Sequence, residues 1–117
     1  MDMFDEEVVL CASSAYEKKF YLNENFEGLP QHVKDELKIM CVLFTEDVGG
    51  VLSLEFDENG NLELNTSADE GDLLYDEIGS VLKIKQMQQE KQELFESLET
   101  YYKVFFLGED IEDDNGD

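Results

Sequence analysis

Residues 51–66 read VLSLEFDENGNLELNT, and this stretch predicts a β-hairpin. Two runs flank the turn Glu58-Asn59-Gly60, whose glycine suits a left-handed backbone. Pairing Asp57 with Asn61 gives the hairpin one apolar and one polar face. The apolar face holds Leu52, Leu54, Phe56, Leu62 and Leu64, with Thr66 at its end, and the polar face holds Ser53, Glu55, Glu63 and Asn65. A shift of one residue would mix the two sets, so the pattern predicts this register.

The segment before the hairpin predicts a helix over residues 30–46. Pro30 suits the first helical position, where its missing N–H would have no partner. The apolar residues at helical spacing are Val33, Leu37, Cys41 and Phe44. Residues 39–44 are apolar nearly all round, so we expect burial on more than one side. Gly49-Gly50 should end this helix.

The segment after the hairpin predicts one long helix from residue 73 to about residue 107. Asp72 is a plausible N-cap, and the stretch has no proline and only Gly79 to interrupt it. A helix of that length spans about 50 Å, which exceeds the width of a small globule. We therefore expect either a break near Gly79 or a portion at residues 86–92 that projects past the core.

The sequence does not decide between strand and helix for residues 8–22. Residues 8–12 are apolar but too short to assign from their period. Ser14 followed by Glu17 has the spacing of a capping box, so we place a first helix from Ala15 to about Leu22. The β-favouring residues 19–22 argue for a strand instead.

These elements predict an α+β fold in which a buried helix, a β-hairpin and a long C-terminal helix surround a single core. The chain has 117 residues, which suits one domain, placed at residues 8–108. Residues 1–7 form an acidic N-terminal tail. Residues 109–117 carry six acids and only Ile111 to bury, so we predict a disordered acidic tail there.

The charge excludes several classes of partner. The chain has 30 acidic residues and 8 basic ones, all lysine, for a formal net charge of -22. A nucleic-acid backbone or an anionic membrane surface would repel it, and without arginine it has no bidentate guanidinium clamp. The acidic start lacks the features of a secretory signal, and no apolar run approaches a membrane span, so we expect a cytoplasmic protein.

Five strings of sequence give the chain a family likeness. They are residues 11–23 (CASSAYEKKFYLN), Val33 with 37–50 (LKIMCVLFTEDVGG), 75–80 (YDEIGS), 82–86 (LKIKQ) and 101–108 (YYKVFFLG). On these strings, the sequence resembles an uncharacterised family, a domain of unknown function, of short acidic bacterial proteins. The resemblance spans roughly residues 8–109. It implies a bacterial cytoplasmic protein and no particular chemistry.

An acidic corner is the one candidate metal site. Glu46 and Asp47 stand at the end of the predicted helix, where the dipole disfavours negative charge by ~0.3–1 kcal/mol per group. The hairpin register brings Asp69, Glu70 and Asp72 toward them, and converging carboxylates suit Ca²⁺ or Mg²⁺. We favour a solvated acidic corner with a helix cap, and we predict neither a metal nor any other cofactor.

The other candidate residues have structural explanations. We expect Cys11 and Cys41 to be reduced thiols in the core, and His32 to be an exposed residue of a helix start. Residues 57–61 superficially suggest a calcium loop, but Leu62 stands where that loop needs glycine. The aromatic cluster Tyr101, Tyr102, Phe105 and Phe106 is by default core contact with the Pro30 helix, and alternatively a self-association surface.

No set of residues forms a recognisable catalytic centre, so we expect a non-enzymatic protein-protein interaction module. The partner is unknown, and the long helix favours a homodimer. One alternative is a nucleic-acid mimic that inhibits a basic DNA- or RNA-binding protein. Another, resting on size and acidity, is a secretion-type chaperone with exposed apolar grooves.

Overall fold

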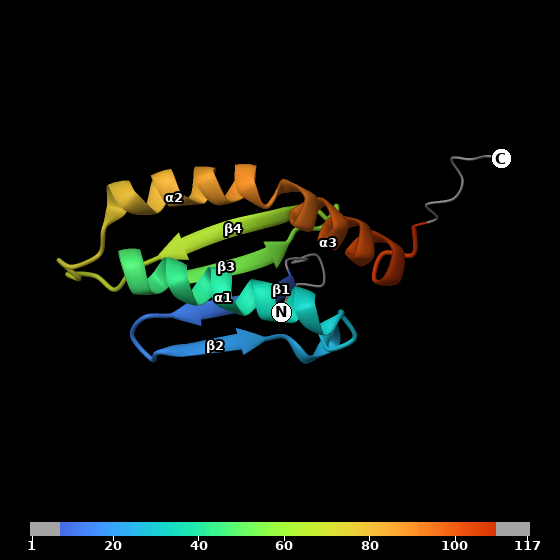
Figure 1. Ribbon diagram of the computed structural model, residues 1–117, viewed down its shortest axis with the longest axis horizontal. Coiled ribbons are helices and arrows are strands. Elements are labelled where there is room, and N and C mark those ends of the chain that lie inside the picture. The colour runs from blue at the N-terminus through green and yellow to red at the C-terminus, as the bar shows by residue number, and fades with distance from the viewer. Residues whose placement is uncertain (1–7, 110–117) are drawn as a thin grey trace.

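The computed structural model describes residues 8–109, and this part of the chain is an α+β fold, as predicted. Four antiparallel strands form one sheet in the order β2-β1-β3-β4. The strands are β1 (Val8–Ser14), β2 (Lys19–Leu22), β3 (Val51–Phe56) and β4 (Leu62–Ser67). The helices are the short 3-10 helix η1 (Glu24–Phe26), α1 (Gln31–Val48), α2 (Glu77–Glu90) and α3 (Gln92–Phe105). Figure 1 shows α1 crossing the sheet, with α2 and α3 on the side of β4.

The predicted hairpin register is confirmed. Phe56 pairs with Leu62, Leu54 with Leu64, and Leu52 with Thr66. The three β3 residues of the apolar face, Leu52, Leu54 and Phe56, are fully buried. They form the floor on which the helices pack, and this burial is what fixes the register.

The helix predicted at residues 15–22 is wrong, because these residues form a turn and the strand β2. The bond expected of a capping box is present, since the Glu17 N–H donates to Ser14 Oγ at 3.1 Å, but it closes a turn. The reason is long-range: β1 lies inside the sheet and pairs with both β2 and β3. Strand pairing on both sides therefore overrides the local helix signal.

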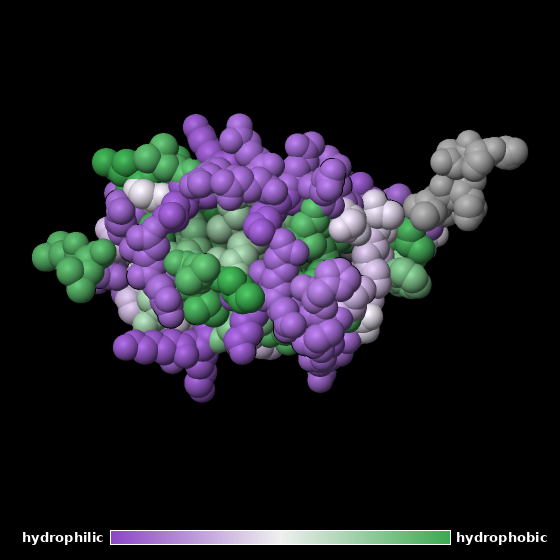
Figure 2. Space-filling model, viewed as in Figure 1, coloured by the Kyte–Doolittle hydropathy of each residue, from purple (hydrophilic) through white to green (hydrophobic). Residues whose placement is uncertain are grey.

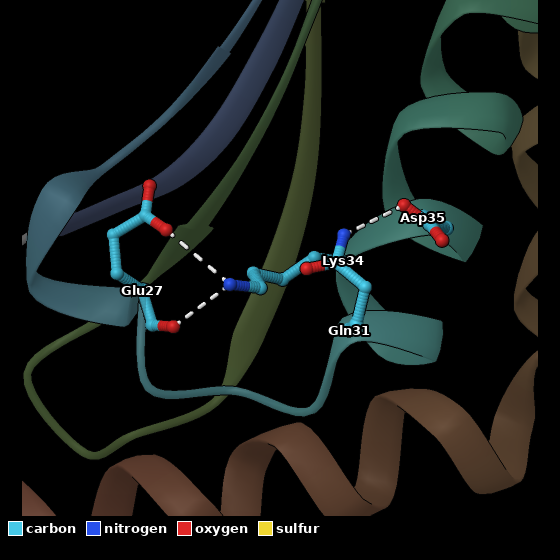
Figure 3. Close-up of polar contacts among 4 residues, drawn as sticks. All are labelled: Glu27, Gln31, Lys34 and Asp35. Carbon is cyan, nitrogen blue, oxygen red and sulfur yellow. Dashed lines mark hydrogen bonds and ion pairs between the residues drawn. The ribbon is translucent and has the colours of Figure 1, made fainter.

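Helix α1 lies where it was predicted, and Gly49 follows its last residue with φ 88°. Its first turn has no side-chain cap. Instead, Lys34 Nζ donates to the Glu27 carbonyl at 2.9 Å, and Gln31 bonds Asp35, as Figure 3 shows. Helix α1 contacts the sheet on one side and α2 on another, so the expected burial on more than one side is confirmed in part. The expected burial nearly all round is wrong, because Ile39 and Leu43 are each 59% exposed.

The predicted long helix is divided at Lys91. We expected either a break near Gly79 or a projecting portion at residues 86–92, and both expectations are wrong. Helix α2 begins at Glu77, and its N-cap is Asp76, whose carboxylate accepts the Gly79 N–H at 2.8 Å. A Cβ on Gly79 would lie 2.2 Å from that carboxylate, so this glycine serves the cap. Lys91 leaves helical geometry and donates to Glu36 of α1 at 2.8 Å.

The predicted N-terminal tail at residues 1–7 lies outside the described residues, as does the tail at 109–117 apart from Glu109. Within the described part, one hydrophobic cluster joins the sheet to all three α-helices. In the same part, each helix is too short or too polar to cross a membrane.

The backbone at Gly50 is packed closely against neighbouring segments at one corner of the fold. A Cβ there would lie 2.5 Å from the Ser67 carbonyl oxygen, and the backbone has φ 71°. Gly71 has a similar φ of 84° with nothing within 4 Å. We expect Gly71→Ala to cost only the left-handed strain of about 1–2 kcal/mol. Gly50→Ala should cost about 1–3 kcal/mol more from overpacking, measured by urea unfolding. Equal losses would show that the Gly50 contact is not needed.

Candidate functional site

One corner of the molecule joins three segments that are distant in sequence. They are the turn between β1 and β2, the end of α1, and the loop between β4 and α2. The Ala15 N–H donates to the Gly50 carbonyl at 2.8 Å, and the Asp76 N–H donates to the Val48 carbonyl at 3.0 Å. The Tyr16 hydroxyl donates to Asp72 at 2.5 Å and accepts the Asp69 N–H at 2.9 Å. Tyr16 thus ties the turn to the loop.

The predicted acidic corner is at this place, but its carboxylates do not converge. Asp47 pairs with Lys83 at 2.9 Å, and Asp72 accepts from Tyr16 and from the Leu74 N–H. Glu46 and Glu70 are exposed. Across residues 8–109, no three His, Cys, Asp or Glu side chains form a group that would hold a metal ion. The corner is held together by polar bonds within the protein.

Tyr16 was missed by sequence reasoning. Its hydrogen bond changes the pKa of its partner, Asp72. Because the phenol donates to the Asp72 carboxylate, the pKa of Tyr16 is raised above 10.0. The same bond, with the Leu74 N–H, lowers the pKa of Asp72 below 3.8. Both groups are exposed, so solvent screens the interaction. Only the sheet pairing of β1 brings Tyr16 here, which explains why no local pattern signalled it.

Tyr16→Phe should make the free energy of unfolding less dependent on pH at both ends. The raised pKa of Tyr16 stabilises the fold below pH 10.0, and that contribution is lost as pH rises through the raised value. The lowered pKa of Asp72 stabilises the fold above pH 3.8, and that contribution is lost as pH falls through the lowered value. We expect the variant to be less stable at neutral pH, measured by urea unfolding.

The control is Tyr21→Phe, which removes the hydroxyl of a tyrosine that is 53% exposed and makes no side-chain hydrogen bond to residues 8–109. It should leave the stability profile unchanged. Identical profiles for Tyr16→Phe and Tyr21→Phe would contradict the proposed tie between turn and loop.

Below this corner lies a groove of about 790 Å³ between the β1–β2 hairpin and α1. We call it the lysine groove, because Lys18, Lys19 and Lys38 line it. The hydroxyls of Ser13 and Thr45 also line it, 2.8 Å apart and both buried. The groove combines cationic side chains with a buried polar pair.

The two cysteines lie in the core as free thiols, without a disulfide, as predicted. Their sulfurs are 3.9 Å apart, and both residues are fully buried. The hydrogen bond with Cys41 raises the pKa of the Cys11 thiol, and burial raises it further. A thiol that stays protonated is a poor nucleophile, so this pair serves packing.

The aromatic cluster at the end of α3 is divided between core and surface, because Tyr102 is buried whereas Phe105 and Phe106 are exposed. Tyr102 is buried and stacks on Phe56 with ring centroids 4.2 Å apart. Phe106 stacks on Phe26 at 4.8 Å. These core partners belong to β3 and η1, whereas contact with the Pro30 helix was expected. Tyr101 is partly buried, and Phe105 is 70% exposed.

An apolar surface that sequence reasoning missed lies at the start of α2 and in the loop before it. We call it the α2 patch. It consists of Leu73, Leu74, Ile78, Val81 and Leu82, which are 94%, 92%, 76%, 56% and 61% exposed. In Figure 2, green side chains stand out over this loop and the start of α2. The spacing of residues 78, 81 and 82 is that of one helical stripe, so the sequence carries a signal for this surface.

A second apolar surface lies between α1 and α2. This groove of about 480 Å³ contains Ile39, Met40, Leu43, Phe44 and Met87. Charged side chains border it, among them Lys83 and Lys91, whose partners are Asp47 and Glu36. His32 also lines this groove and is exposed, as expected of a helix-start residue.

The fold and these sites define a small acidic α+β protein with a polar corner, a lysine groove and exposed apolar surfaces. The chain belongs to DUF6145, a family of unknown function, which matches residues 7–110. The predicted resemblance to an uncharacterised family is thereby confirmed. No curated protein and no solved structure matches the chain.

Proposed function

We propose that this protein is a non-enzymatic interaction module of the bacterial cytoplasm that binds a protein partner through the α2 patch. The supporting observation is the exposure of five large aliphatic side chains between residues 73 and 82. Large apolar side chains exposed together at one end of a molecule favour an interaction site. Burying such a side chain fully stabilises a complex by about 1.5–3 kcal/mol.

The patch is separate from the surface that α2 uses for its own fold. Ser80 is buried, and Ile84 and Met87 pack against the core. These residues recur on one side of the helix, whereas Ile78, Val81 and Leu82 lie on another. The outer side contributes little to folding, so its apolar character suits binding.

A hollow beside the patch offers a place for a partner side chain. It has a volume of about 1020 Å³ and lies between the end of β4, the following loop and the start of α2. Leu73, Ile78, Val81 and Leu82 line it together with polar residues. A partner would therefore meet both a raised apolar segment and a concave surface.

The charge around the patch favours a basic partner. Asp69, Asp72 and Glu77 line the same hollow, and the whole chain has a net charge of -22. A segment with apolar residues and neighbouring lysines or arginines would match both features. A second copy would bring like charges together, so we place a different protein on the patch and treat the homodimer as an outcome of the test.

A nucleic-acid mimic would share the preference for a basic partner, but it would bind through carboxylates. The exposure of the α2 patch favours apolar contact instead. A secretion-type chaperone would also use exposed apolar grooves. The proposed interaction module and a secretion-type chaperone would bind different partners, and a cross-linking experiment identifies the partner.

The double variant Leu74→Ser/Ile78→Ser should fold normally and lose its partner. Both side chains are largely exposed, so each change should alter the free energy of unfolding by no more than about 0.5 kcal/mol. A photo-reactive amino acid placed at Val81 should give a discrete adduct in cells, which the double variant abolishes. Mass spectrometry of the adduct should identify a basic segment.

Phe105→Ser provides the matched control, because Phe105 is 70% exposed and lies on α3. It should leave the adduct unchanged. Loss of the adduct in this control, or no adduct at Val81, would contradict binding through the α2 patch. Light scattering of the purified protein tests whether the α2 patch binds a second copy of the chain. If the protein is a dimer and the double variant is a monomer, the patch binds a second copy and not a basic partner.

A further inference from the structure

The lysine groove carries an inference that rests on other observations than the α2 patch does, although Leu74 belongs to both surfaces. Lysines are scarce in this chain, 8 of them against 30 acids, yet Lys18, Lys19 and Lys38 line one groove. We propose that the groove binds a small organic anion, a carboxylate or phosphate monoester that carries a short apolar body.

These three lysines have no ionic partner within residues 8–109; Lys85 and Lys103 have none either, but the three share one groove. Lys34, Lys83 and Lys91 each form an ion pair, and Figure 3 shows Lys34 held by Glu27. Within residues 8–109, the ammonium groups of the groove lysines make neither an ion pair nor a hydrogen bond. In a protein so rich in carboxylates, unpaired lysines that share one concave surface leave positive charge available for a ligand.

Three carboxylates, Glu46, Asp47 and Asp72, line the groove with the lysines and cancel part of this charge. Asp47 pairs with Lys83, and Asp72 accepts from Tyr16. Glu46 alone has no such bond within residues 8–109. Because Lys83 neutralises Asp47, the three lysines face two charged carboxylates, Glu46 and Asp72, and the lining keeps an excess of one positive charge (three minus two). An ammonium group binds carboxylate and phosphate oxygens as a point charge.

The turn holds one of these lysines in an unusual conformation. Lys18 has φ 55°, and it is the non-glycine residue with a positive φ in the described part of the chain. A left-handed backbone costs a residue with a Cβ about 1–2 kcal/mol. Strain of this kind is often found where a side chain is positioned for binding. Here it accompanies a lysine at the edge of the groove.

The interior of the groove suits an apolar body. Phe20, Val42 and Val48 line it beside the buried hydroxyls of Ser13 and Thr45. Helix α1 leaves Phe20 of the edge strand β2 only partly covered. An inorganic ion would use the lysines alone, whereas an alkyl chain would also cover Phe20 and Val42.

A nuclear magnetic resonance titration of the ¹⁵N-labelled full chain tests this site with hexyl phosphate and hexanoate. At least one should shift the amide signals of residues 13–20 and 38–48 in a saturable manner. Inorganic phosphate should bind at least tenfold more weakly because it lacks the apolar body, and hexylammonium should cause no such shifts. The proposal would be overturned if hexylammonium bound as tightly as both anions. It would also be overturned if inorganic phosphate bound as tightly as the organic anions.

The double variant Lys18→Gln/Lys38→Gln should weaken binding of the preferred probe at least tenfold, with a well-dispersed spectrum that shows the fold is intact. Lys85→Gln is the matched control. Lys85 is exposed, unpaired within residues 8–109 and outside the groove, so the change should alter the affinity less than twofold. Equal weakening by the two variants, or shifts spread over the whole surface, would assign the effect to general charge and refute the site.

Discussion

The close approach of three segments at Gly50 is the constraint on which the other features depend. The Gly50 carbonyl accepts the Ala15 N–H, and the missing side chain leaves room for Ser67 and Tyr75. This contact sets where the β1–β2 turn lies relative to the end of α1. It thereby positions one wall of the lysine groove. It also fixes the loop from which the α2 patch begins.

The parts of the fold that were predictable have local causes. The hairpin register follows from the alternation of residues 51–56 and 62–66, which has only one arrangement with a single apolar face. Helix α1 follows from the spacing of its core residues and from Gly49 at its end. Each signal lies within the segment that it shapes, so no knowledge of distant partners was needed.

The missed features have non-local causes. Residues 15–22 carry a helix-capping pattern, but β1 gains two strand partners and pulls these residues into a hairpin. The division at Lys91 coincides with an ion pair to Glu36, which is far away in sequence. Similarly, the role of Tyr16 requires the loop at Asp72. For the sites, the sequence located the acidic corner, but it did not show that the carboxylates are bonded within the protein.

The acidity of the chain makes the positions of its few lysines informative. Lys34 holds the first turn of α1, Lys91 joins the α2–α3 junction to α1, and Lys83 joins α2 to the end of α1. These three lysines connect elements, so their positions are explained by the fold. Lys18, Lys19 and Lys38 connect nothing within the described residues, although carboxylates line the same groove. If lysines were needed only to relieve repulsion among acids, they would lie beside carboxylates, as the first three do. Lys85 and Lys103 also form no ion pair within the described residues, so what needs an explanation is the shared concave surface of the groove lysines, and an anionic ligand provides one.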